Sequence, residues 1–430
     1  MRATTSRYFF ISLFRKILFT LLLFPLLSYA DDHLKAVPSD MPGIPLTHFE
    51  GWSVTFDGRV NAYATRITGD AQPATINSDG VVIGGDAADD DLDSFRLRTG
   101  FNPSRLGLNV RSPLVDGYTM GARLGFYPSI QDDNLKNSST NLDIREVFFT
   151  IGNDNIGEFQ VGRSLSLYQR EHVVLDISGY GVGATGTGGN GTTAGRVGFG
   201  YLYDNFAPAV IYRPAISDAF NLAVGLYDPS HIKGANGVGA TVTPAPRLEA
   251  EATFDMDMGG AKVRIFGSAL WQTAEFAADV GGTGGAEEGD SVTATGLGYG
   301  MTVSLGMFAV DLTGYSGQAL GTVVMLDGNA LDEDGEERDH SGWYSQFHYI
   351  PCDTLEIVAS FGVSNADETD GDEDSGNSYV ELQSSSSLIA IYDFNPWLSF
   401  TGEITSALTE YTGDEDQRNT IIALGTIFQW

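Results

Sequence analysis

The chain has little of what usually stabilises or anchors a protein. It contains one cysteine, Cys352, among 430 residues, so an internal disulfide is excluded. Its 24 lysines and arginines are outnumbered by 56 aspartates and glutamates, which gives a formal net charge of −32. So acidic a chain will not bind nucleic acid by neutralising phosphates. After residue 30 there is no run of about 20 apolar residues, so no transmembrane helix is expected there.

Catalytic and metal-binding motifs are also scarce. The six histidines show no metal-ligand spacing, and none pairs with a serine elbow. Asp370, Asp372, Asp374 and Glu381 match part of a calcium-loop spacing, but Ser375 replaces the glycine of the sharp turn. A solvated acidic loop is the main interpretation, and divalent-cation binding that closes a loop or bridges to lipopolysaccharide is the alternative. We expect no enzymatic activity, no metal and no cofactor.

The start of the chain has the three-part pattern of a secretory signal peptide. Four basic residues precede an apolar run over 17–27, and Ser28-Tyr29-Ala30 follows. This pattern predicts export past the inner membrane and cleavage after Ala30. The expected organisation is a signal peptide over 1–30, a short periplasmic segment over 31–51 and a barrel domain over 52–430.

The end of the chain alternates as a membrane strand does. Within 419–430, Ile422, Leu424, Phe428 and Trp430 share one parity, which gives a mostly apolar face with an aromatic residue at the membrane interface. The 53 glycines and the many aromatics also suit a barrel that has no ordinary hydrophobic core. This last strand resembles the signal that bacterial barrel-assembly machinery reads, so that machinery is an expected partner.

Candidate strands are joined by connections that alternate between short and long. Short connections at 153–155, 258–260 and 351–352 contrast with long ones such as 165–206 and 318–340. Outer-membrane barrels have this order, with short periplasmic turns and long external loops, whereas a soluble sandwich, the alternative, does not. Sixteen strands enclose an aqueous channel rather than a core filled by side chains. The predicted strands are 53–66, 104–112, 117–127, 142–152, 156–164, 207–216, 219–228, 247–257, 261–274, 291–304, 307–317, 341–350, 353–365, 378–393, 396–411 and 418–430.

We therefore predict an all-β fold, a 16-stranded antiparallel transmembrane β-barrel in the outer membrane of a Gram-negative bacterium. Two segments also resemble the general bacterial porins. Residues 145–168 (REVFFTIGNDNIGEFQVGRSLSLY) are similar to the fourth and fifth strands of that family, and residues 105–127 to the second and third. The resemblance implies a homotrimer, contacts with outer-membrane lipid and lipopolysaccharide, and passive diffusion of ions and small hydrophilic solutes.

The resemblance further implies a pore narrowed by an inward-folded third loop, with arginines of the early strands facing acidic groups on that loop. The Pro-Glu-Phe-Gly sequence of the enterobacterial constriction loop is absent from 165–206, which leaves the geometry of the constriction open. Strict alternation places Arg163 on the outward face, unless a bulge near Gly162 re-aims it or it lies at the rim. The candidate pore-lining residues are Arg59, Arg105, Arg111, Arg123, Arg163, Glu171 and Asp176.

Inward parity farther along the chain collects mostly acidic residues. Fixed negative charge near the permeation path predicts a modest preference for cations. A substrate-selective channel is the alternative and would need an aromatic track, to which Tyr127, Tyr180 and Tyr315 could contribute. A barrel enzyme is less expected, because no serine-histidine pair at the rim is evident. The candidate acidic lumen residues are Glu249, Glu251, Asp255, Asp257, Asp311, Glu356 and Glu403.

Overall fold

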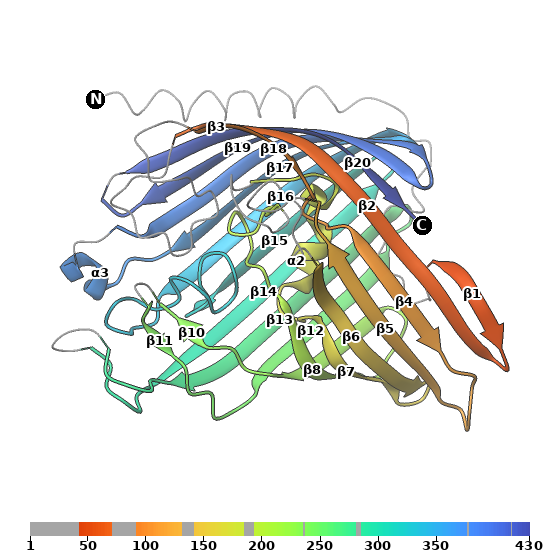
Figure 1. The fold of residues 1–430 in the computed structure, drawn as a ribbon, viewed down its shortest axis with the longest axis horizontal. Coiled ribbons are helices and arrows are strands. Elements are labelled where there is room, and N and C mark those ends of the chain that lie inside the picture. Colours follow the sequence, from red (N-terminus) through yellow and green to blue (C-terminus); the bar gives the residue numbers. More distant parts are fainter. Residues whose placement is uncertain are drawn as a thin grey trace.

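The computed structural model describes residues 43–70, 92–130, 142–184, 193–234, 237–280, 285–375, 378–413 and 415–430. The predicted signal peptide and most of the predicted segment 31–51 lie outside these residues. Strands dominate the fold (Figure 1). The wall consists of β2 (Trp52–Gly69), β3 (Leu92–Arg98), β4 (Arg105–Arg111), β5 (Thr119–Pro128), β6 (Leu142–Asn153), β7 (Gly157–Leu165), β8 (Phe206–Arg213), β9 (Phe220–Tyr227), β12 (Arg247–Asp257), β13 (Ala261–Glu275), β14 (Ser291–Leu305), β15 (Phe308–Gln318), β16 (Asp339–Cys352), β17 (Leu355–Ala366), β18 (Val380–Asn395), β19 (Leu398–Tyr411) and β20 (Asp416–Gln429).

These strands close into an antiparallel barrel. The last strand, β20, pairs with residues 59–69 of β2, which leaves no open edge between the two ends of the sheet. β3 pairs with residues 63–69 of β2, and β4 pairs with residues 53–59. β3 and β4 therefore occupy one position in the wall, and the barrel has sixteen strands, as the sequence predicts.

The break between β3 and β4 contacts the interior of the barrel. Pro103 has no backbone N–H for a strand ladder, and the ladder is interrupted around it. The Phe101 N–H donates to the Gly181 carbonyl, 3.1 Å away, in the loop between β7 and β8. The interrupted strand thereby ties the wall to that loop.

A short strand extends the wall beyond the C-terminus. The backbones of Trp430 and Gly58 exchange two hydrogen bonds, with N–O distances of 2.9 and 3.2 Å. Beyond that point β1 (Ile44–Phe49) pairs with residues 52–56 of β2. Thus β1 covers the part of β2 that β20 does not reach.

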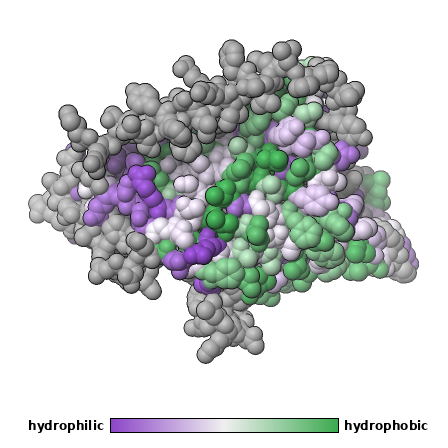
Figure 2. Space-filling view, turned by 90° about the horizontal axis from the view of Figure 1, so that it is seen from above, coloured by the Kyte–Doolittle hydropathy of each residue, from purple (hydrophilic) through white to green (hydrophobic). Residues whose placement is uncertain are grey.

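The two faces of the wall differ in polarity, as the period-two pattern predicts. On β20, Leu424 is 66 % exposed while its neighbour Ala423 is 1 % exposed. On β4, Leu106 faces outward, and Arg105 and Asn109 face inward. Apolar side chains gather over the strands on the right of the space-filling view, and hydrophilic ones gather toward the left (Figure 2). No described helix is long and apolar enough to cross a membrane.

The sixteen predicted strands are all present, and most of their bounds agree within about three residues; β12 has the predicted bounds. The alternative of a soluble sandwich is wrong, because one sheet closes on itself. One strand was missed, since β3 lies within the predicted loop 67–103. The sequence of β3 does show the period of two that predicts a strand, because outward Phe95 and Leu97 alternate with polar Ser94 and Arg96.

The connections at one end are long and carry the remaining elements. The third loop, residues 166–205, contains the helix α2 (Arg170–Leu175) and the 3₁₀ turn η1 (Ile177–Tyr180). Loop 228–246 carries β10 (Ile232–Lys233) and β11 (Gly239–Ala240), and loop 367–379 carries α3 (Asp370–Ser375). The largest buried apolar cluster joins the third loop to loop 319–338 and to β13 and β14, rather than filling the barrel.

Candidate functional site

A charged cluster lies on the inner face of β2, β4, β5 and β6. The Asp57 carboxylate is 1 % exposed and accepts from Arg123 at 2.7 Å and from Arg105 at 2.8 Å. Arg123 also donates to Glu146 at 2.9 Å and to the Asn109 side-chain oxygen at 2.6 Å. Alternation of inward residues on these four paired strands brings these groups together, and Asp57 and Glu146 compensate two of the arginines.

Arg59 differs from the other arginines of this wall in its partners. It donates to the Pro103 carbonyl at 2.7 Å and to the Asn102 side-chain oxygen, both neutral acceptors in the break between β3 and β4. Within the described chain it has no carboxylate at ion-pair distance. Arg111 also has inward parity, but it lies six residues along β4 from Arg105, toward the short-turn end. In the described chain, the partners of Arg59 are therefore neutral oxygens and not a carboxylate.

The third loop is bound to the inner wall where it leaves β7. The Glu249 carboxylate accepts the backbone N–H groups of Leu167 and Tyr168 at 2.8 and 3.0 Å. The same carboxylate forms a buried ion pair with Arg247 at 2.8 Å. Arg170 of the loop forms an ion pair with Glu251. Two predicted lumen acids of β12 therefore position the loop instead of facing solvent.

The middle of the third loop is held by β15 and β16. His172 is fully buried, which lowers its pKa to about 4 and keeps the ring neutral at pH 7. Its Nε2 lies 3.0 Å from the Gly314 carbonyl and donates to it. The Gln346 side chain donates to the Leu175 carbonyl and accepts the Ile177 N–H, both at 2.8 Å.

The tip of the loop is held by two further carboxylates. Asp176 accepts the Ser178 N–H, the Arg196 N–H and the Tyr201 hydroxyl, and its side chain caps η1. Glu403 of β19 accepts the Val182 and Gly183 N–H groups at 2.7 and 2.8 Å. The path of the loop is thus fixed by side chains of β12, β16 and β19 and by a backbone carbonyl of β15. Figure 1 labels α2, which belongs to this loop.

Three residues of the predicted pore-lining set do not have the surroundings that the family pattern implies. Asp176 is 3 % exposed, and its carboxylate oxygens accept hydrogen bonds from other residues of the third loop. It therefore does not face the arginines of β2, β4 and β5. Arg163 is exposed on the outer face, because its cross-strand partner Val147 is 43 % exposed there. Glu171 lies on α2 near Arg264 of β13, 3.5 Å away, and burial raises its carboxyl pKa. The acidic side of the pore therefore does not come from the loop positions that the family pattern suggests.

The other predicted acids divide into paired and exposed groups. Asp255 forms an ion pair with Arg264 at 2.7 Å, and exposed Asp257 accepts the Gly259 N–H in the turn after β12. Asp311 and Glu356 share His348, at 2.8 and 2.7 Å. Asp393 on β18, which the sequence reasoning missed, is partly exposed and accepts the Ser399 hydroxyl.

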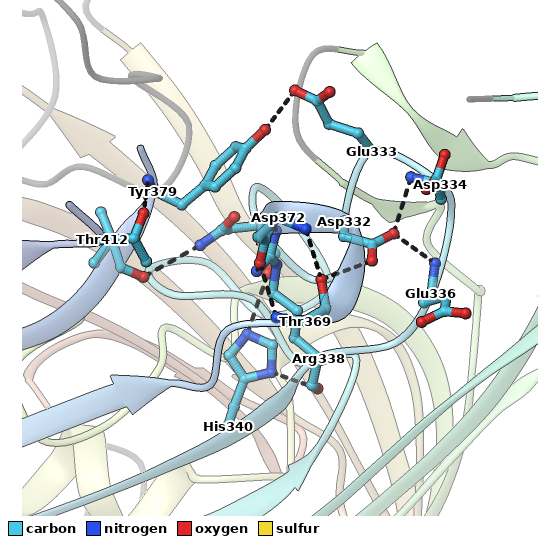
Figure 3. Close-up of polar contacts among 12 residues, drawn as sticks. Asp332, Glu333, Asp334, Glu336, Arg338, His340, Thr369, Asp372, Tyr379 and Thr412 are labelled. Atoms are coloured by element: carbon cyan, nitrogen blue, oxygen red, sulfur yellow. Dashed lines mark hydrogen bonds and ion pairs between the residues drawn. The ribbon is translucent and has the colours of Figure 1, made fainter. Parts of the chain in front are cut away.

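A separate cluster joins the loops at the long-loop end (Figure 3). Arg338 and Asp372 form an ion pair in which the side chains are 2 % and 0 % exposed, and the guanidinium carbon lies 5.0 Å from the centre of the Tyr379 ring. The Thr369 hydroxyl donates to Asp332 at 2.7 Å. The Thr412 N–H donates a hydrogen bond to the Tyr379 carbonyl, with an N–O distance of 3.0 Å. We call this cluster the loop clasp, because it joins loops 319–338, 367–379 and 412–415.

The loop clasp also bears on the calcium-loop alternative. Asp372, one of the matching positions, is engaged by Arg338, and the Asp374 side chain lies outside the described residues. Among the side chains that the structure describes, no group of three or more histidine, cysteine, aspartate and glutamate residues is arranged to hold a metal ion.

Comparison with known proteins agrees with this architecture. Residues 20–388 match the family model described as Gram-negative porin. The outer membrane channel DcaP of Acinetobacter baumannii is 15 % identical, with a TM-score of 0.66 over 91 % of this chain and 100 % of that chain. The anion-selective porin from Comamonas acidovorans is 12 % identical, with a TM-score of 0.58 over 88 % and 100 %. A trimer form of OmpT from Vibrio cholerae is 15 % identical, with a TM-score of 0.51 over 89 % and 100 %. No curated protein sequence matches the chain.

The structural likenesses, all below 25 % identity, support the fold, and the family match covers most of the sequence. A closed barrel with an apolar outer face and a polar lumen resides in the outer membrane and acts as a channel, not as an enzyme. The chain belongs to the family of Gram-negative porins.

Proposed function

We propose that this porin is a weakly selective diffusion channel for ions and small hydrophilic solutes, with a mild preference for cations. The single observation that carries the proposal is the third loop, which is bound across the lumen by wall side chains between β12 and β19. A loop fixed in this way narrows a wide barrel without filling it, so that solutes are sorted by size and charge.

A transverse field supports the charge part of the proposal. Arg59 on β2 is held by neutral oxygens, whereas Asp393 on β18, and Asp311 and Glu356, which share His348, lie on the inner face of other strands. Three of the seven acids expected in the lumen, Glu249, Glu251 and Asp255, are compensated by Arg247, Arg170 and Arg264, and Asp311 and Glu356 share His348, so the preference for cations is mild. The acidic composition of the whole chain adds negative potential at the mouth.

Reversal potentials in planar bilayers under a potassium chloride gradient test the selectivity. We expect cations to be favoured by a small factor at low salt, and this factor to decrease as ionic strength rises, because screening shortens the range of fixed charges. A preference for anions would contradict the cation part of the proposal. Absence of any conductance by correctly folded protein would contradict the channel itself.

The assembly and its partners are also proposals. We propose a homotrimer by analogy with the Vibrio cholerae OmpT, which is recorded in a trimer form. The alternating terminal strand over 419–430 supports recognition by the barrel-assembly machinery, and the apolar outer face supports contact with outer-membrane lipid and lipopolysaccharide. We further propose that residues 1–30 are a signal peptide that is removed on export, followed by a periplasmic segment over 31–51 and the barrel domain over 52–430.

A further inference from the structure

An aromatic side chain of the third loop, that of Tyr180, is exposed. Tyr180 is 37 % exposed, whereas its neighbours Ile177, Ser178 and Val182 are between 0 and 7 % exposed. The other tyrosines that the sequence suggested for an aromatic track, Tyr127 and Tyr315, are buried. Tyr180 is therefore the member of that set that a passing solute can reach.

The backbone around Tyr180 is fixed on both sides. Before it, the Ile177 N–H donates to Gln346. After it, the Gly181 carbonyl accepts the Phe101 N–H at 3.1 Å, and a β-carbon at Gly181 would lie 2.2 Å from a Glu403 oxygen. The ring is presented by a rigid segment, and a rigid segment loses little entropy when a solute contacts it.

Charges of opposite sign act on the Tyr180 hydroxyl. On one side of this segment, a β-carbon at Gly179 would lie 3.7 Å from the β-carbon of Asn102, whose side-chain oxygen accepts from Arg59. On the other side, Ile177 packs with Ile391, which lies two residues before Asp393 on the inner face of β18. Burial raises the pKa of the Tyr180 hydroxyl, Arg59 lowers it, and Glu356 and Asp393 raise it further. Arg59 donates to neutral oxygens, and Asp393 accepts the Ser399 hydroxyl, so neither forms an ion pair within the described chain. The phenol therefore lies between a cationic and an anionic part of the lumen.

We propose that Tyr180 is the specificity-determining residue of the passage, and that with Arg59 and Asp393 it forms a site for small zwitterionic solutes. The inference rests on the proposed channel function. The solute carboxylate faces Arg59, its ammonium group faces Asp393 and Glu356, and the aliphatic body lies on the ring while the hydroxyl forms a hydrogen bond. An uncharged solute of the same size gains only the contact with the ring.

Liposome swelling with two solutes of similar length tests this site. The zwitterion 6-aminohexanoate and the uncharged 1,6-hexanediol are compared for the native chain, for Tyr180→Ala and for Tyr180→Phe. Tyr299→Ala serves as the matched control, because Tyr299 is 56 % exposed on the outer face of β14. Heat-dependent gel mobility establishes that each variant has folded as a barrel.

In the native protein we expect the zwitterion to enter faster than the diol. Tyr180→Ala should lower the ratio of the two rates by about threefold or more, the size of one net hydrogen bond and a ring contact. Tyr180→Phe keeps the ring and should lower the ratio less, and it serves as the test should the alanine variant fail to fold. Tyr299→Ala should leave the ratio unchanged.

Two results would contradict the proposed site for zwitterions. One is a native ratio below one, and the other is an unchanged ratio in both Tyr180 variants while both solutes still enter. Failure of either solute to enter any folded variant would instead refute the channel, and the site with it. The two failures are therefore distinguishable.

Discussion

At the scale of single residues, Asp204 is the least favourable group in the third loop. It is fully buried, and neither carboxylate oxygen has a hydrogen-bond partner among the residues that the structure describes. Burial and nearby Glu249 raise its carboxyl pKa well above the ordinary value. A group of this kind costs about 1–3 kcal/mol when it must ionise without a partner. The folded loop therefore disfavours the charged form.

Replacing Asp204 with asparagine should stabilise the protein in a pH-dependent way. The folded pKa lies above the unfolded value of about 3.9, so the free energy of unfolding falls as pH rises from that value toward the folded pKa. We expect Asp204→Asn to unfold at a higher temperature than the native chain at pH 8, with a smaller difference at pH 5. Exposed Asp228→Asn is the control. An equal difference in unfolding temperature at pH 8 and at pH 5 would contradict the raised pKa of Asp204.

At the scale of elements, the period-two pattern was enough to predict the wall. Most strands are long and alternate without interruption, as in residues 247–257 and 418–430. β3 was missed because it is seven residues long and is separated from β4 by a break at Pro103. The inward direction of Arg59, Arg105 and Arg123 followed from parity alone, because parity needs no knowledge of distant contacts.

Which charges neutralise each other could not be predicted in the same way. Glu249 and Glu403 have the inward parity expected, but the amide groups that they bind lie 81 and 220 residues away in sequence. The path of the third loop depends on such contacts, and the family pattern misplaced Asp176 for that reason. Parity fixes the face of the sheet on which a side chain lies, whereas the partner depends on how the loop folds back.

The anchors of the third loop can be tested on one strand. Glu403→Ala removes the acceptor of two buried N–H groups, which should cost about 1–3 kcal/mol for each group left unpaired. Because the strand ladder remains, the barrel should still fold while residues 182–183 loosen. We expect larger current fluctuations and a higher mean conductance in single-channel recordings.

The matched control for this anchor is Glu410→Ala on the same strand, where Glu410 has the opposite parity. It should conduct as the native chain does. If Glu403→Ala also gave native conductance and native noise, the carboxylate would not hold the loop in place.

At the scale of the whole molecule, the barrel and its loops are stabilised by different interactions. The wall depends on backbone pairing around a closed ring and on burial of its outer face in lipid. The long-loop end depends on side chains, above all on the ion pair between Arg338 and Asp372 in the loop clasp. A substitution in the clasp should therefore open the mouth without unfolding the barrel.

Arg338→Met tests this separation. It leaves the Asp372 carboxylate buried without its cation, which costs about 3–5 kcal/mol, whereas Arg418→Met breaks an exposed pair with Asp416 worth about 0–1 kcal/mol. We expect proteinase K to cut loops 319–338 and 367–379 faster in Arg338→Met, while the heat-dependent gel mobility of the barrel stays native and Arg418→Met resembles the native chain. Equal cleavage rates in all three proteins would mean that the clasp does not hold these loops together. Loss of the barrel band in Arg338→Met would mean that wall and loops are a single cooperative unit, which closure of the strand ladder argues against.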